Sequence, residues 1–337
     1  MQRYIIRRIL LNFLVIFLVA TLVFLVLRID STNVVRSKSG GCAGATPELL
    51  AECNKIAKAS LGLDKSLPEQ YLNFMTDTAQ LDFGTSFKSQ NPVFGEIKER
   101  ALPTIELGIL QILVAVIVAL PIGIISAVRQ DSWADYMLRF FSIAFLGIPT
   151  FVVAILVINY SGEWGAGLGL DEWLGPQGTY YDFWDPFGWT PSESNAFENF
   201  KIMFAPAVIG GLGTGAVIMR FLRSQMLEVL RQDYVRTAWS KGLKERTIIV
   251  RHALKNALIP VLTLLGILLG SIVSGNVVLE SIYRIPGVGF YITAAVAQSP
   301  DFPVIQGIVI LVAIVLVFVN LLVDIAYGWL DPRIRYS

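Results

Sequence analysis

Residues 107–128, LGILQILVAVIVALPIGIISAV, decide the fold class of this chain. The stretch contains no Asp, Glu, Lys, Arg or His. About 20 apolar residues in a helix are enough to cross the apolar core of a bilayer, which is roughly 30 Å thick. Backbone N–H and C=O groups in lipid need partners within their own segment, and a helix supplies them. The stretch therefore predicts a membrane-spanning helix.

Five more stretches are equally apolar and also lack charged residues and histidine. We predict an all-α integral membrane protein with six transmembrane helices. Pro121 and Pro149 lie inside two of the predicted spans and are expected to kink them. The five further stretches are Ile9–Leu27, Phe140–Tyr160, Ile202–Met219, Ala257–Leu279 and Val304–Val323.

The composition of the 337 residues excludes several other classes of protein. Hydrophobic residues make up 54% and charged residues 16%, against roughly 25% charged in an average soluble domain. This mixture is incompatible with a disordered chain, a coiled coil or a basic nucleic-acid-binding arm. The chain has one histidine, His252, and two cysteines, Cys42 and Cys53. Zinc motifs built from several such ligands are therefore absent, and no metal site is predicted.

The distribution of basic residues predicts the orientation in the membrane. Lys and Arg concentrate on the cytoplasmic side of membrane proteins. The segment 220–256 holds nine bases and three acids, whereas 161–201 holds one base and seven acids. The N-terminus has three bases and no acid, and the short connection 129–139 contains Arg129 and Arg139. With six spans, both termini and both basic connections fall in the cytoplasm.

We accordingly divide the chain by membrane segment. Residues 1–27 form the N-terminal segment and first transmembrane helix, and 28–104 form an extracytoplasmic cap. Residues 105–337 form a five-helix core, with an outer loop at 161–201 and a cytoplasmic loop at 220–256.

The predicted cap is small and helical. Thr46-Pro47-Glu48 and Ser66-Leu67-Pro68-Glu69 each place a capping residue and a proline at a helix start. Cys42 and Cys53 both lie in the cap. Either they form a disulfide that staples it, or they stay as two free thiols.

The cytoplasmic loop 220–256 has the pattern of helix, turn and helix, with Gly242 at the turn. A basic cytoplasmic loop is alternatively a topology signal that contacts anionic lipid head groups. Its residues favour a more specific interpretation. The stretches DYVRTA at 233–238, KGL at 241–243 and HALKNALIP at 252–260 resemble the cytoplasmic loop of permeases of ATP-binding-cassette importers.

The resemblance is to the dipeptide/oligopeptide/nickel permease family, specifically its B-type permease subunit, and it extends over most of the chain. LGLDK at 61–65, DFG at 82–84, IPGVG at 285–289 and DFPVIQG at 301–307 agree with that family in the same order. Two outer segments depart from the family pattern. Ile29-Asp30-Ser31-Thr32 replaces the usual Pro-Gly-Asp-Pro, and the loop 161–201 matches no pattern.

The resemblance implies a type I importer fold in the prokaryotic inner or plasma membrane. It implies a permease that forms half of the translocation path for di- or oligopeptides. The implied partners are a second homologous permease, two ABC ATPase subunits, an extracytoplasmic substrate-binding protein and membrane lipid, but no nucleic acid. The chain lacks the phosphate-binding motif G-x-x-x-x-G-K-[ST]. We therefore expect a transport subunit rather than an enzyme, with no cofactor of its own and with ATP and Mg bound by the partners.

In that family the cytoplasmic loop docks on the ATPase. Small residues at 237 and 238 suit close packing, and Gly242 permits a turn with positive φ. Trp239 and Leu243 suit the apolar centre of an interface, with bases at its rim. The alternative function is a stand-alone secondary transporter or channel for a small solute, which the lack of charged groups within the spans disfavours. The predicted ATPase-coupling residues are Arg236, Thr237, Ala238, Trp239, Lys241, Gly242 and Leu243.

Overall fold

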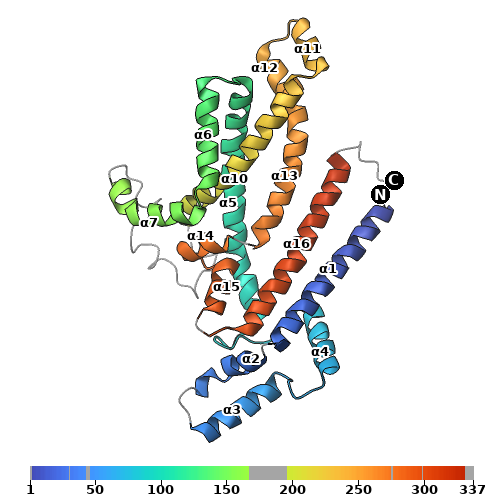
Figure 1. Ribbon diagram of the computed structural model, residues 1–337, viewed down its shortest axis with the longest axis vertical. Helices are drawn as coiled ribbons and strands as arrows, with labels where there is room; N and C mark the ends of the chain where they lie inside the picture. The colour runs from blue at the N-terminus through green and yellow to red at the C-terminus, as the bar shows by residue number, and fades with distance from the viewer. Residues whose placement is uncertain are drawn as a thin grey trace. The chain divides into compact units, whose positions relative to one another are not determined.

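The computed structural model describes residues 2–29, 31–42, 46–166, 196–274, 276–297 and 299–330 (Figure 1). Within these ranges every regular element is helical, apart from an isolated bridge between Thr85 and Pro92. The all-α prediction is therefore confirmed. The chain divides into two compact units, 1–102 with 287–337 and 103–286. The helices are α1 (Gln2–Ile29), α2 (Ser31–Lys38), η1 (Gly40–Cys42), α3 (Pro47–Ser60), α4 (Leu67–Ala79), α5 (Val93–Val128), α6 (Trp133–Gly147), α7 (Thr150–Ala166), α10 (Ala196–Leu230), α11 (Asp233–Ser240), α12 (Glu245–Thr247), the π-helical segment η2 (Ile248–Leu254), α13 (Lys255–Ser274), α14 (Val277–Ile282), α15 (Val288–Val296) and α16 (Phe302–Leu330).

The unit 103–286 is built around α10, which packs against α5, α6 and α13. Its larger core combines small residues of α5, such as Ala115 and Ala119, with the buried side chains of Leu222 and Met226 on α10. Ala257 of α13 closes the same cluster. Without a hydrophobic driving force in lipid, helices associate through close packing, which small residues allow.

Two glycines of α10 bring its backbone close to α5. A Cβ atom at Gly211 would lie 2.7 Å from Cβ of Val114 and 2.8 Å from the carbonyl oxygen of Gln111. At Gly215 it would lie 3.2 Å from the carbonyl oxygen of Ala115. The missing side chains are therefore used for packing within the chain.

Gly211→Ala is expected to lower the stability of this unit by about 1–3 kcal/mol, the usual cost of overpacking. The added methyl group would collide with α5 on both a side chain and the backbone. The matched control is Gly213→Ala, whose methyl group would meet only Thr150 at 3.4 Å. The thermal midpoint of the purified protein measures both effects. Equal midpoints for the two variants would contradict the tight contact at Gly211.

The predicted span Phe140–Tyr160 is not one kinked helix. It is split into α6 and α7, whose axes differ by 92°. Ile148, the last residue before Pro149, is extended with φ −89° and ψ 119°. A residue that precedes proline is pushed out of the helical region, and proline has no N–H to continue the helix. The sequence predicted the position of the bend at Pro149 correctly, but the helix is broken there instead of kinked.

Other predicted boundaries also need correction. The helix containing 107–128 begins at Val93, and α10 continues beyond Met219 to Leu230. The fifth span ends at Ser274 instead of Leu279, because the side chain of Asn276 caps the separate helix α14. Five described helices are long and apolar enough to span a membrane, or six if α6 and α7 together form one span. Most of the predicted outer loop 161–201 lies outside the described residues.

In the other unit α1 packs along α16, and the two lie side by side in Figure 1. The cap helix α4 is attached to α1 by aromatic contacts. The ring of Phe24 lies 5.2 Å from that of Tyr71 and 5.5 Å from that of Phe74, measured between centroids. The hydroxyls of Thr21 and Tyr71 share a hydrogen bond of 2.9 Å.

Two of the sequence motifs meet in this unit. Gly307 lies against Phe83, because a Cβ atom at the glycine would lie only 3.2 Å from Cβ of the phenylalanine. The buried carboxylate of Asp301 accepts hydrogen bonds from the Ser86 hydroxyl at 2.6 Å and from the Lys88 N–H at 3.2 Å. The residues DFG and DFPVIQG, far apart in sequence, therefore form one structural contact.

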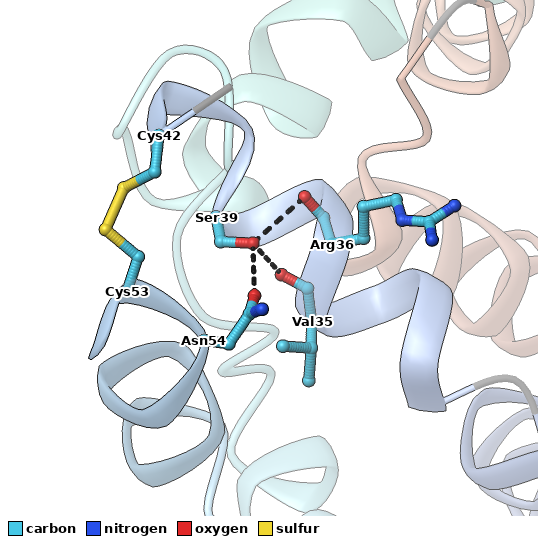
Figure 2. The surroundings of a disulfide bond; sticks show 6 residues. All are labelled: Val35, Arg36, Ser39, Cys42, Cys53 and Asn54. Atoms are coloured by element: carbon cyan, nitrogen blue, oxygen red, sulfur yellow. Dashed lines mark hydrogen bonds between the residues drawn. A yellow bond between two sulfur atoms is a disulfide. The ribbon is translucent and has the colours of Figure 1, made fainter. Parts of the chain in front are cut away.

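The cap helices begin where the sequence predicts. Thr46 and Ser66 precede α3 and α4, and each helix has proline in its first turn. In the structure Cys42 and Cys53 are joined by a disulfide, with 6.7 Å between their Cα atoms (Figure 2). The bond ties η1 to α3.

Candidate functional site: the cytoplasmic loop

The loop after α10 forms a short helix, α11, that is held by its own small core. Val235 and Ile248 are fully buried, and Ala238 is 6% exposed. Val235 and Ala238 are three residues apart and share one face of α11. Val229 and Leu230, at the end of α10, pack against the same cluster. The loop is thus a folded element, which Figure 1 shows at the end of α10 and α13, beyond the connection between α5 and α6.

Gly242 ends α11 with φ +71°, in the left-handed region. Its N–H donates to the carbonyl of Trp239 at 2.9 Å, and the N–H of Lys241 donates to that of Thr237 at 3.1 Å. A Cβ atom at Gly242 would meet nothing within 4 Å. Glycine is therefore favoured by the backbone conformation and not by lack of space, because an L-residue is disfavoured in this region.

The rest of the surface of α11 and of the turn that follows it is exposed. Trp239 is 48% exposed, and Leu243, just past the end of α11, is 38% exposed. The side chain of Arg236 is 75% exposed, and Lys241 is exposed beside them. Thr237 is exposed too, with its hydroxyl donating to the carbonyl of Asp233.

The structure therefore separates the seven predicted coupling residues. Six of them are exposed, whereas Ala238 faces inward. The small size of Ala238 serves packing on Ile248 within the loop, and not a contact at the outer surface. The sequence motif does not separate the two roles, because both call for a small residue.

The loop is also fixed to the start of the next span. The Nδ2 atom of Asn256 donates to the hydroxyl of Tyr234 and to the carbonyl of His252, both at 2.9 Å. Between α12 and α13 the backbone is π-helical over Ile248–Leu254. Such segments are rare and frequently occur at functional sites. The apolar periodicity predicted a helix here but did not reveal its widened turn.

A buried ionic cluster at the base of this loop was missed by the sequence analysis. The side chain of Asp135 on α6 is fully buried. The guanidinium group of Arg223 on α10 donates two hydrogen bonds to this carboxylate, from Nε to Oδ1 at 3.0 Å and from Nη2 to Oδ2 at 2.9 Å. The Ser126 hydroxyl of α5 and the Asp131 N–H also donate to the carboxylate. Arg139 lies 3.3 Å from Oδ2.

The cluster joins the α5–α6 connection to α10, the helix that precedes the α11 loop. Bidentate pairing of arginine with carboxylate is strong and fixes orientation. The sequence contained one sign of this cluster. The connection 129–139 has two acids beside its two bases, although it was expected to be basic. Charge alone, however, does not tell a buried acid from a solvated one.

These features together define a multispanning membrane subunit whose sequence lacks a phosphate-binding motif and whose loop after α10 is folded and carries exposed apolar side chains. The chain belongs to the family described as binding-protein-dependent transport system inner membrane component, whose model matches residues 119–336. The N-terminal model of the same kind of membrane component matches residues 1–108. The protein is therefore a permease subunit of an ATP-binding-cassette importer in the inner membrane. The alternative of a stand-alone transporter or channel is wrong.

Several similar proteins span the whole chain. A dipeptide transport system permease protein of Alkalihalophilus pseudofirmus is 34% identical, with all of both chains aligned. A glutathione transport system permease protein of Pectobacterium atrosepticum is 33% identical, again over both whole chains. A dipeptide transport system permease protein of Bacillus subtilis is 35% identical over 99% of this chain and 98% of its own. Importers of this family work with ATPase subunits, a substrate-binding protein and a second permease.

Proposed function

We propose that this permease forms half of a peptide translocation path and that α11 transmits the motion of an ATPase subunit to it. The observation that carries the proposal is the exposed pair Trp239 and Leu243 on a loop held rigid by its own core. Interfaces commonly place such apolar anchors at the centre and basic residues at the rim. Arg236 and Lys241 occupy that rim.

The connections of the loop support transmission of force. α11 follows α10 after a two-residue turn, and the Asn256–Tyr234 contact holds it to α13. A push on α11 would thus reach two long helices at once. Arg223 links α10 to α6, so that α6, α10 and α13 would move together. Rigid-body rocking of packed helices between two states fits this arrangement.

The proposed complex contains this permease, a second similar permease, two ATPase subunits and a substrate-binding protein at the outer face. ATP and Mg would be bound by the ATPase subunits, because this sequence lacks the phosphate-binding motif. The chain itself would need no cofactor.

Peptides are the proposed substrate. The names of the relatives include dipeptide and glutathione transport, and glutathione is itself a small peptide. The uncharged spans also suit a substrate whose backbone is accepted without readout of its side chains. A dedicated nickel site is not proposed, since no predicted span contains His or Cys.

The test is uptake into proteoliposomes that contain the whole importer and its binding protein. We expect uptake of a labelled dipeptide that requires ATP and is reduced by unlabelled di- and tripeptides, but not by free amino acids. Uptake without ATP would contradict the role of the loop. ATP-dependent uptake of another solute, with none of any peptide, would contradict the substrate class and leave the coupling role intact.

A further inference from the structure

A basic cavity of about 660 Å³ lies in the cap, a size typical of small-molecule sites. Its lining comes from the end of α1, from α2, η1 and α3, and from the turn and first residues of α4. Four cations line it, and no Asp or Glu does among the described residues. They are Arg28, Arg36, Lys58 and Lys65.

These cations have little compensation from the protein. Lys65 pairs with Glu69 at 3.3 Å, but both side chains are about half exposed, and such pairs are weak. Within the described part of the chain Arg36 and Lys58 form no ion pair. Arg28 lies over the ring of Phe24 at 5.0 Å, and its Nε is buried without a hydrogen-bond acceptor. A buried donor without an acceptor is costly, which points to an anion as the missing partner.

Gln70 adds a second group without a hydrogen-bond partner, which is an acceptor whereas Arg28 Nε is a donor. It is 7% exposed and lines the same cavity. Its Nε2 donates to the carbonyl of Lys65 at 2.7 Å, which leaves the buried Oε1 without a donor. A ligand that satisfies both groups carries an oxyanion and also a hydrogen-bond donor, such as a hydroxyl.

The wall of the cavity is set by the disulfide. Figure 2 shows Ser39 beside the Cys42–Cys53 bond, with its hydroxyl directed at Asn54 and at the carbonyl of Val35. Ser39 Oγ lies 2.9 Å from Oδ1 of Asn54 and 2.9 Å from the carbonyl oxygen of Val35. Ser39, Asn54 and Val35 all line the cavity. The covalent link therefore holds this wall in place before any ligand enters, which reduces the cost of binding.

The cavity lies at the end of a membrane span. Arg28 is the last residue but one of α1, whose final residue Ile29 is 86% exposed. The lining also contains Leu50 and Leu67, which are 41% and 63% exposed. Basic side chains next to exposed apolar ones at the end of a span match the boundary between phosphate groups and acyl chains. This favours a lipid over a soluble anion.

We propose that the cavity binds the phosphate of an anionic phospholipid whose head group carries hydroxyls, as a phosphatidylglycerol does. The cations neutralise the phosphate, and Gln70 Oε1 accepts from a head-group hydroxyl. A smaller cavity of about 300 Å³ shares Arg28, Lys65 and Gln70 and gives the head group further room. One carboxylate, Asp77, lines that smaller cavity. The proposal does not depend on the transported substrate.

The experiment uses the whole importer, purified from vesicles of equal phosphatidylglycerol and phosphatidylcholine, with retained lipid identified by native mass spectrometry. We expect the unmodified complex to retain phosphatidylglycerol selectively. The double variant Arg36→Gln/Lys58→Gln should lower its retention about tenfold or more, because two charges facing the anion are removed. The matched control is Lys55→Gln, on the same helix but outside the cavity, which should retain as much as the unmodified complex.

Three results would overturn the proposal. The first is that the unmodified complex retains the two lipids equally, or that the double variant retains as much phosphatidylglycerol as the unmodified complex. The second is displacement of the lipid by inorganic phosphate or glycerol phosphate at low concentration, which would assign the cavity to a soluble anion. The third is normal lipid retention in a double variant that no longer captures the binding protein. Thiol titration shows whether Cys42–Cys53 is intact, and the exposed single variant Lys58→Gln repeats the test if the double variant folds poorly.

Discussion

Gly242→Val is expected to reduce ATP-driven uptake about tenfold or more while the protein still inserts into the membrane. The residue has φ +71°, and the left-handed region costs an L-residue about 1–2 kcal/mol, with β-branched residues the worst. About 1.4 kcal/mol corresponds to a tenfold change in an equilibrium. Relief of the strain would unwind the end of α11 and displace Leu243 from the exposed face. ATP hydrolysis would then continue without uptake, and both rates are measured in the same proteoliposomes.

Gly242→Asn is the matched control. Asparagine adopts positive φ more readily than other residues, and the space around the Cβ position is empty within the chain. We expect this variant to keep most of the uptake. An equal loss in both variants would mean that a partner approaches the glycine directly and that strain is not the cause. Normal uptake in the valine variant would contradict the assignment of the loop to ATPase docking.

Asp135→Asn is expected to destabilise the unit 103–286 by about 3–5 kcal/mol, the usual effect of removing one partner of a buried ion pair. The carboxylate is fully buried, and Arg223 is only 16% exposed. The change leaves the arginine facing a neutral amide. The thermal midpoint of the purified protein and its amount in the membrane both measure the loss.

Asp131→Asn provides the control four residues earlier. The Asp131 side chain is exposed and accepts only from Gln130 in the structure, so that the same chemical change should alter stability by less than about 0.5 kcal/mol. The double variant Asp135→Asn/Arg223→Gln should recover part of the loss, since it also removes the more buried arginine charge and leaves only Arg139, which is 33% exposed. A midpoint for Asp135→Asn equal to that of Asp131→Asn would mean that the cluster does not stabilise the fold.

Much of the fold was predictable because its signals are local. Runs of uncharged apolar residues marked the spans, and the proline-containing starts at Thr46 and Ser66 marked the cap helices. The turn at Gly242 was predictable for the same reason, since positive φ favours glycine in any context. The motif around 233–243 located the exposed loop through the resemblance.

The sequence did not predict how sharply the chain bends at Pro149 or which side chains of each helix are buried. Pro149 indicated a kink, yet whether a proline bends or breaks a span depends on what its neighbours satisfy, and here the two halves differ by 92°. The burial of Asp135 depends on Arg223, a residue 88 positions away. The inward position of Ala238 depends on Ile248, across the turn.

The sequence by itself determined the fold class and the approximate positions of the spans, because hydropathy and turn chemistry act within short segments. Its resemblance to a known family located the loop proposed to meet the ATPase. Only the tertiary structure decided which face of each helix is buried. In a bilayer the side chains that face lipid are as apolar as those that face protein, so that composition does not distinguish them. The cap cavity also depends on the tertiary structure, because its four cations come from separate elements and meet only when α1, α2, α3 and the turn before α4 have packed together.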